Sequence, residues 1–223
     1  MRYKIVVLLL VLLLLTPMIS SCTKSYSTIL EDATCRPPCW KNIHPGITKV
    51  DDAVHILEDM EEVHFPPSFY ETDFNKGEGF FTLLFNARVY EFSGMIYFHD
   101  NLVTKIEFDT EKITLGDIVD KLGNPEQFLA VSGWADTKWL NIYLIYPNGV
   151  IVTFFKSNIM WVEKGLFDLK DNMKVFSILY FDPELYNEVL KTDVLNRSVY
   201  DNAILIDNIQ EWHGFGLIEY YDP

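Results

Sequence analysis

Residues 113–125, ITLGDIVDKLGNP, decide the fold because they predict a short amphipathic helix with both of its ends marked. The segment opens with the pattern Ile-Thr-x-x-Asp, and threonine is a favourable N-cap residue. Gly123 is a natural C-terminal cap, and Pro125 prevents the helix from continuing. The apolar residues that recur at helical spacing are Leu115, Ile118, Val119 and Leu122. The sequence therefore predicts a helix with one buried face.

The residues after this helix have the composition of β-strands. Two runs rich in aromatic and β-branched residues, Trp139–Tyr146 and Val150–Phe155, flank the turn sequence Pro147-Asn148-Gly149. Asn-Gly between two apolar runs is the strongest short signal for a β-hairpin. Asn158–Val162 and Val175–Phe181 are predicted as further strands.

The first half of the chain repeats this order of elements. Ile47-Thr48 and Asp51 repeat the helix-start pattern, with Thr48 as the expected N-cap. The strands predicted after it are Phe80–Phe85, Val89–Phe98 and Leu102–Phe108. Polar and apolar residues alternate over 105–108, which predicts a sheet with one face in water. We therefore expect an α+β fold of two tandem helix-plus-antiparallel-meander units. A chance recurrence of a common helix start is the alternative to an internal duplication.

The pattern divides the chain into four segments. Residues 1–21 are predicted to be a signal peptide and residues 22–34 a polar tether, so that the folded body begins near Cys35. Residues 35–110 form the first unit and residues 111–223 the second. The second unit also carries a C-terminal helix and an aromatic tail that we expect to dock on the body.

The start of the chain resembles the export signal of bacterial lipoproteins. A basic start, Met1–Lys4, precedes an apolar run, Ile5–Leu15, that is shorter than the about 20 residues a membrane-spanning helix needs. Ile19-Ser20-Ser21-Cys22 then resembles a lipobox. The resemblance implies cleavage before Cys22, attachment of acyl chains such as palmitate to that residue, and a place in the cell envelope on the extracytoplasmic side of the membrane. An ordinary secretory signal and an uncleaved anchor helix are the alternatives.

Charge and composition exclude several classes of function. The formal net charge at pH 7 is −14, from 18 basic and 32 acidic residues. Nucleic-acid binding depends on Lys and Arg that neutralise phosphates, so we expect no nucleic acid as a partner. Anionic lipid headgroups would repel the chain too, so the membrane contact is assigned to the lipid on Cys22. An apolar content of 49% is too high for a disordered chain.

Cys35 and Cys39 are predicted to form a structural disulfide, because an exported protein meets an oxidising compartment. Bridged Cα atoms lie about 4.4–6.8 Å apart, whereas an extended polyproline segment would hold these two roughly 12 Å apart. The chain must therefore turn at Pro37-Pro38, for which a cis peptide is one solution. The alternatives are a redox-active pair, free thiols, and a metal site that includes His44.

The sequence carries none of the motifs that signal a catalytic or metal centre. It lacks His-Glu-x-x-His, Gly-x-Ser-x-Gly and the glycine patterns that bind phosphates or dinucleotides. We therefore predict that the protein is not an enzyme and that it uses no metal and no cofactor. Acidic residues are abundant, so a hydrolase that uses two carboxylates remains an alternative.

Aromatic residues are the one surplus in the composition, and the tryptophans are the candidate contacts for a ligand or partner. They are Trp40, Trp134, Trp139, Trp161 and Trp212. An exposed aromatic face or groove would suit a partner protein, an apolar ligand or a glycan. Packing in the core is the alternative, because alternation along strands points half of such side chains inward. We also consider a contact between Trp40 and Trp212, which would close the fold.

Two groups of proteins share short patterns with this chain. Gly46-Ile47-Thr48 and Ile113-Thr114 through Leu122-Gly123-Asn124-Pro125 resemble the Gly-x-Thr … Leu-Gly-x-Pro pattern of the SmpA/OmlA-like small lipoproteins. This resemblance implies helix-plus-three-strand domains and, as in outer-membrane assembly machinery, a non-catalytic scaffold role. Pro38-Cys39-Trp40 with Pro45-Gly46, together with Trp-x-Gly-Phe from Trp212, also resembles a group of uncharacterised bacterial lipoproteins.

The function predicted from these observations is that of a membrane-anchored, non-enzymatic binding or scaffold lipoprotein with an envelope protein as its partner. It predicts an exposed apolar groove or sheet edge. An envelope protein that binds a small apolar or sugar molecule is the first alternative, and it predicts a pocket lined by the tryptophans. The carboxylate-dependent hydrolase is the second, and it predicts two carboxylates with perturbed pKa values in one cleft.

Overall fold

The fold is described from a computed structural model of the whole chain. The structure describes residues 27–30, 35–60, 69–73, 78–84, 92–110, 112–134, 137–159, 165–195 and 205–222. Cys22 and the predicted signal peptide lie outside the described residues, as does Trp161. Within the described part of the chain, no helix has the length and apolar character that crossing a bilayer requires.

A single antiparallel sheet of nine strands organises the molecule, and the predicted α+β class is confirmed. The strand order is β1-β2-β3-β4-β9-β7-β6-β5-β10. The strands are β1 (Phe69–Asp73), β2 (Glu78–Leu84), β3 (Phe92–His99), β4 (Leu102–Thr110), β5 (Gln127–Trp134), β6 (Lys138–Tyr146), β7 (Val150–Ser157), β9 (Ser177–Phe181) and β10 (Gln210–Glu211). A separate two-stranded sheet pairs β8 (Leu166–Leu169) with β11 (Gly216–Glu219).

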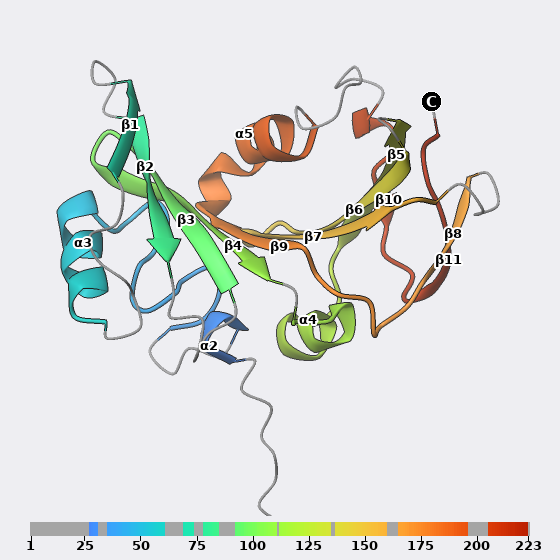
Figure 1. Cartoon of the computed structure of the whole chain (residues 1–223), viewed down its shortest axis with the longest axis horizontal. Helices are drawn as coiled ribbons and strands as arrows, with labels where there is room; N and C mark the ends of the chain where they lie inside the picture. Colours follow the sequence, from blue (N-terminus) through green and yellow to red (C-terminus); the bar gives the residue numbers. More distant parts are fainter. Residues whose placement is uncertain are drawn as a thin grey trace, which may run out of the picture.

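Helices cover both faces of the curved sheet (Figure 1). On one face lie α2 (Ser27–Leu30), α3 (Val50–Glu58) and α4 (Leu115–Leu122), and their apolar residues join the larger core cluster. The opposite face carries a helical segment made of η2 (Pro183–Leu185), α5 (Tyr186–Val189) and η3 (Leu190–Leu195). Its residues Val189, Leu190 and Val194 belong to a second core cluster. Along the central strands, the side chains on both faces of the sheet are therefore buried.

Each half of the described chain contributes a helix followed by consecutive antiparallel strands. Helix α3 precedes the four strands β1, β2, β3 and β4, and helix α4 precedes the three strands β5, β6 and β7. Strand β9 lies between β4 and β7 and joins the two meanders into one sheet. The sequence predicts no strand at β1, β5, β8, β10 or β11. A strand is also predicted over 158–162, whereas β7 ends at Ser157, Asn158 has a positive φ of 57°, and residues 160–162 lie outside the described residues.

The repeated Ile-Thr-x-x-Asp motif acts differently in the two halves. At α4, Thr114 is the N-cap, and it forms a complete capping box with Asp117. At α3, the N-cap is Lys49 and no side chain caps the helix, so the predicted role of Thr48 as a cap was wrong. The Thr48 hydroxyl instead accepts a hydrogen bond from the backbone N–H of His44. The same motif therefore starts one helix and closes the preceding loop of the other.

The strand face predicted to lie in water is covered. Lys105 and Glu107 point to the face that carries α5, and Lys105 forms an ion pair with Asp193 of η3 at 3.0 Å. Glu107 is buried and accepts a hydrogen bond from the Tyr97 hydroxyl at 3.0 Å. The alternation over 105–108 does mark two different faces of β4. The polar face, however, is covered by the C-terminal helical segment and does not lie in water.

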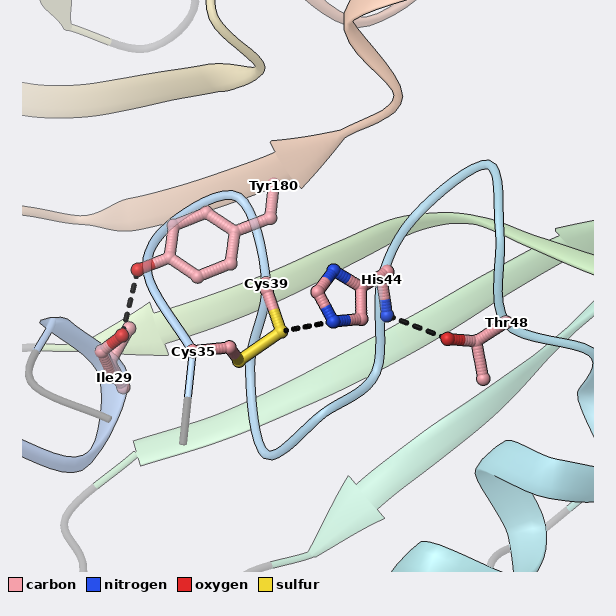
Figure 2. Close-up of a disulfide and its surroundings, with 6 residues drawn as sticks. All are labelled: Ile29, Cys35, Cys39, His44, Thr48 and Tyr180. Carbon is pink, nitrogen blue, oxygen red and sulfur yellow. Dashed lines mark hydrogen bonds between the residues drawn. A yellow bond between two sulfur atoms is a disulfide. The ribbon is translucent and has the colours of Figure 1, made fainter. Parts of the chain in front are cut away.

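The predicted tether also needs correction, because part of it is packed into the body. In α2, Ile29 and Leu30 are buried in the larger core cluster. The buried Tyr180 hydroxyl donates a hydrogen bond to the Ile29 carbonyl at 2.7 Å (Figure 2). The folded body therefore includes α2 and does not begin near Cys35.

The C-terminal tail is docked, as the sequence predicted. Strand β10 pairs with β5, β11 pairs with β8, and Tyr221 forms a parallel bridge with Val131. Asp222 adds an ion pair with Lys138 at 2.7 Å. The tail thus extends the sheet and covers its edge.

Candidate functional site: the disulfide loop and its pocket

The predicted disulfide between Cys35 and Cys39 is present, with its Cα atoms 5.7 Å apart. The chain reverses between the two cysteines through a cis peptide at Pro37–Pro38, and Cys39 N donates to the Arg36 carbonyl at 3.0 Å. A local turn therefore brings the two sulfurs together, as the chain-length argument required.

A second tight turn follows the disulfide at once. Trp40 and Ile43 exchange two backbone hydrogen bonds, of 3.1 and 2.8 Å, around Lys41 and Asn42, which both have positive φ. Two consecutive residues of positive φ are what a two-residue turn of type I′ requires. Trp40 and Ile43 are completely buried, and the Trp40 ring packs edge-on against Phe108 at 5.1 Å. Two core anchors therefore hold this turn against the sheet.

The turn directs the chain back so that His44 faces the disulfide (Figure 2). Its Nε2 atom lies 3.2 Å from Cys39 Sγ. Because a disulfide sulfur carries no hydrogen, the hydrogen of this contact must belong to Nε2. The backbone N–H of His44 donates to Thr48 Oγ1 at 2.7 Å, which holds the residue in place. His44 is thus a positioned donor to one sulfur of the bridge.

Cys35, Cys39 and His44 also form the arrangement closest to a metal site in the described part of the chain. Their potential ligand atoms all lie within 4.8 Å of one another. Cysteine binds metals as the thiolate, however, and both sulfurs are joined in the disulfide. Only His44 remains as a ligand, and a structural zinc site needs four. The oxidised loop does not suit a metal ion.

A pocket of about 540 Å³ lies beside the disulfide loop. Within the described part of the chain, it is lined by helix α2, the disulfide loop, the end of α4 and the β6–β7 hairpin. The residues that line it are Leu30, Cys35, Arg36, Pro37, Lys121, Leu122, Tyr146, Asn148 and Val150. Its size falls in the range of small-molecule sites, about 300–1,000 Å³. The pocket combines apolar walls with two exposed cations, Arg36 and Lys121.

Close backbone contacts fix the wall formed by the β6–β7 hairpin. Gly149 has φ +105°, and a Cβ there would lie 2.8 Å from Pro38 Cγ of the disulfide loop. Only glycine therefore allows this approach. The Tyr146 hydroxyl donates to the Gly123 carbonyl at 3.0 Å, and burial raises the pKa of Tyr146 far above its usual range. Tyr146 is consequently a neutral structural donor at physiological pH.

The structure separates the tryptophan candidates and does not gather them around the pocket. Trp40 is a core residue, so its proposed role as a surface contact was wrong. Trp139 is half-buried on β6 and covers Gly133 of β5. Trp212 is half-buried and packs edge-on against Phe128 of β5 at 6.1 Å. Trp40 instead packs against Phe108 of β4, and three strands separate β4 from β5 in the sheet. The side chain of Trp134, like Trp161, lies outside what the structure describes.

Sequence reasoning found the two cysteines but missed the pocket and the role of His44. Arg36 and Lys121 are ordinary surface residues in sequence, and a contact between two distant segments brings them to one cavity. The sequence marks His44 only as a candidate metal ligand. The one local signal for its position is the compact spacing Cys39–His44 around an Asn-containing turn.

No protein-family model, curated protein or solved structure matches this chain. The resemblance to the SmpA/OmlA-like lipoproteins stays a prediction.

Proposed function

We propose that the protein is an extracytoplasmic lipoprotein, anchored in the membrane through acylated Cys22, that acts as a non-enzymatic binding module. The observation that carries the binding role is the pocket beside the disulfide loop. Its described lining offers apolar contacts and two positive charges, and none of those lining residues is a carboxylate. That composition favours capture of an anionic group with an apolar part over carboxylate-dependent hydrolysis.

The position of α2 supports a close contact between this pocket and the membrane. Leu30 of α2 lines the pocket, and only Thr23–Tyr26 separate Cys22 from Ser27. Fully extended, this link reaches roughly 18 Å at about 3.6 Å per residue. An acylated Cys22 would therefore hold the pocket side of the body near the lipid headgroups. Arg36 and Lys121 face this side in a chain that is otherwise strongly acidic.

A second candidate function is the binding of a small ligand, and the same pocket favours it for a different class of ligand from the one the sequence predicts. The predicted site for an apolar or sugar ligand was to be lined by tryptophans, but no tryptophan is among the described residues that line this pocket. A ligand with a carboxylate or phosphate suits Arg36 and Lys121 better, because both oxyanions accept hydrogen bonds from such cations.

Anchoring is tested with the full chain and its Cys22→Ala variant in cells fed labelled palmitate. We expect the wild type to carry label and to partition with membranes, and the variant to lose both. Mass spectrometry that finds an intact signal peptide, or an unmodified Cys22 on the mature chain, would reject the anchor.

Binding is tested by placing a photo-crosslinking amino acid at Asn148, which is exposed and lines the pocket. We expect a defined crosslinked product in intact membranes, which the double charge reversal Arg36→Glu/Lys121→Glu removes. The matched control is Lys156→Glu/Lys191→Glu, which makes the same charge change at two exposed sites that do not line the pocket. A product that survives the pocket variant as well as the control variant would exclude the pocket as the binding site.

A further inference from the structure

We propose that the Cys35–Cys39 disulfide is an exchangeable redox centre, in which a partner dithiol attacks Cys35 and Cys39 leaves as a thiolate stabilised by His44. This inference does not depend on the lipid anchor or on what the pocket binds. It rests on three observations: the unequal exposure of the two cysteines, the pocket beside Cys35, and the imidazole beside Cys39.

The two cysteines are not equally exposed. Cys39 is 3% exposed, whereas Cys35 is half-buried and lines the pocket. Thiol–disulfide exchange requires a thiolate to approach one sulfur, and access decides which sulfur it reaches. An incoming thiolate therefore meets Cys35, and the exposed Arg36 beside it is an attractive charge for that anion.

The leaving sulfur is the one that contacts His44. Its Nε2–H donates to Cys39 Sγ at 3.2 Å while the bond is intact. When the S–S bond breaks, negative charge develops on this sulfur, and a hydrogen bond to a charged acceptor is stronger than one to a neutral acceptor. A leaving thiol of lower pKa departs faster, and a hydrogen bond donated to a thiolate favours that charged form.

The backbone that carries the imidazole is held in place before the reaction. Thr48 accepts the His44 backbone N–H, and the turn between Trp40 and Ile43 fixes the chain on the other side. Trp40 and Ile43, which flank the turn, are completely buried, so the core supports the loop rigidly. A donor that is already oriented needs little reorganisation when the thiolate forms.

The exchange balances as two displacements. In the first, the partner thiolate forms an S–S bond to Cys35, the Cys35–Cys39 bond breaks, and its electron pair goes to Cys39, which then takes a proton from solvent. In the second, the other thiolate of the partner attacks the partner's own sulfur in the mixed disulfide and releases Cys35, which is also protonated. The partner dithiol is oxidised to a disulfide by two electrons, and this chain is reduced to two thiols.

The first test uses the oxidised full chain and dithiothreitol or reduced glutathione as probes. Samples are quenched with acid, blocked with iodoacetamide and mapped by peptide mass spectrometry, which keeps Cys22 apart from the pair. We expect reduction of the folded protein, and a glutathione adduct on Cys35. An adduct found on Cys39, or a bridge that is reduced only after the protein unfolds, would overturn the proposal.

The second test measures the reduction rate of variants at His44. We expect His44→Ala to slow reduction about tenfold, the scale of a lost hydrogen bond to a charged group, and His44→Gln to retain part of the rate through its amide N–H. His55→Ala is the matched control, because His55 is exposed on α3 and contacts Glu58 instead. Circular dichroism of each variant checks its folding. Equal rates for folded His44→Ala and His55→Ala would refute the role of His44, and the adduct map tests the attack on Cys35 even if His44→Ala does not fold.

Discussion

The Tyr180 hydroxyl and the Ile29 carbonyl form a buried hydrogen bond of 2.7 Å between residues 151 positions apart in the chain. Tyr180 lies on β9, the strand that joins the two meanders, and its ring packs edge-on against Phe108 of β4 at 5.5 Å. This contact fastens the N-terminal segment to the middle of the sheet. It also brings Leu30 to the pocket.

Replacing Tyr180 with Phe removes only the hydroxyl, so the buried Ile29 carbonyl loses this hydrogen-bond donor. We expect Tyr180→Phe to lower the free energy of unfolding by about 1–3 kcal/mol, measured by urea titration. Tyr186→Phe is the comparison, because its hydroxyl donates to Gln127 at 3.2 Å from a half-buried position where water can replace it. A loss for Tyr180→Phe no larger than for Tyr186→Phe would show that α2 is not held by this bond.

The two copies of the helix-start motif predict different costs of substitution. Asp117→Ala removes one side of the capping box at α4, and we expect it to destabilise the protein by about 1 kcal/mol. Asp51→Ala changes the corresponding residue of the sequence motif, but Asp51 is exposed and takes no part in capping, so its effect should stay within about 0.5 kcal/mol. Chemical denaturation of both variants checks this difference. Equal losses would mean that the motif caps both helices.

The ion pair between Lys138 and Asp222 fastens the C-terminal tail. Their side chains are 11% and 10% exposed, and Asp222 also accepts a hydrogen bond from Ser132 at 2.6 Å. We expect Asp222→Ala to cost about 1.5–3 kcal/mol, because it removes a hydrogen bond between charged groups that are largely shielded from water. Asp168→Ala is the matched control. It breaks the exposed pair with Lys170 and should cost less than about 1 kcal/mol. Similar losses in the two variants, compared by urea titration, would contradict a buried role for the tail.

The same ion pair predicts a loss of stability at high pH. Burial acts to lower the pKa of Lys138, but the hydrogen bond from Lys138 to Asp222, with the charges of Tyr220 and Asp222, outweighs it and raises that pKa above 10.5. A pKa raised by folding means that the contribution is complete below pH 10.5 and is lost as the pH rises through the folded-state value. Unfolding titrations of wild type and Asp222→Ala should therefore converge above pH 10.5. A constant difference across that range would argue against the ion pair as its source.

Gly133 is required by the tryptophan that covers it. Gly133 of β5 lies directly opposite Trp139 of β6, and a Cβ at Gly133 would overlap the Trp139 ring. We expect Gly133→Ala to destabilise the protein by about 1–3 kcal/mol through overpacking. The double variant Gly133→Ala/Trp139→Leu should recover part of this loss, which thermal melts would detect. Failure of the smaller side chain to restore any stability would place the strain elsewhere.

Several elements follow from local sequence. Helix α4 carries its N-cap, apolar stripe and C-terminal glycine within one short segment, and the Asn148-Gly149 turn specifies the β6–β7 hairpin in the same way. The Cys35–Cys39 bridge follows from a short loop with a forced turn. The local sequence was not sufficient to predict the start of α3. There, Thr48 accepts a hydrogen bond from His44 in the preceding loop, and Lys49 is the N-cap.

The sequence by itself determined the α+β class, helix α4, the β6–β7 hairpin and the Cys35–Cys39 disulfide. Capping, turn chemistry and short loop closure act between residues that are near one another in the chain. Only the tertiary structure decided that α2 docks under β9, that η3 covers the polar side of β4, and that Arg36 and Lys121 share one pocket. Those contacts join segments far apart in sequence. Their free energy comes from burying surfaces together, and no local pattern records which surface will meet which.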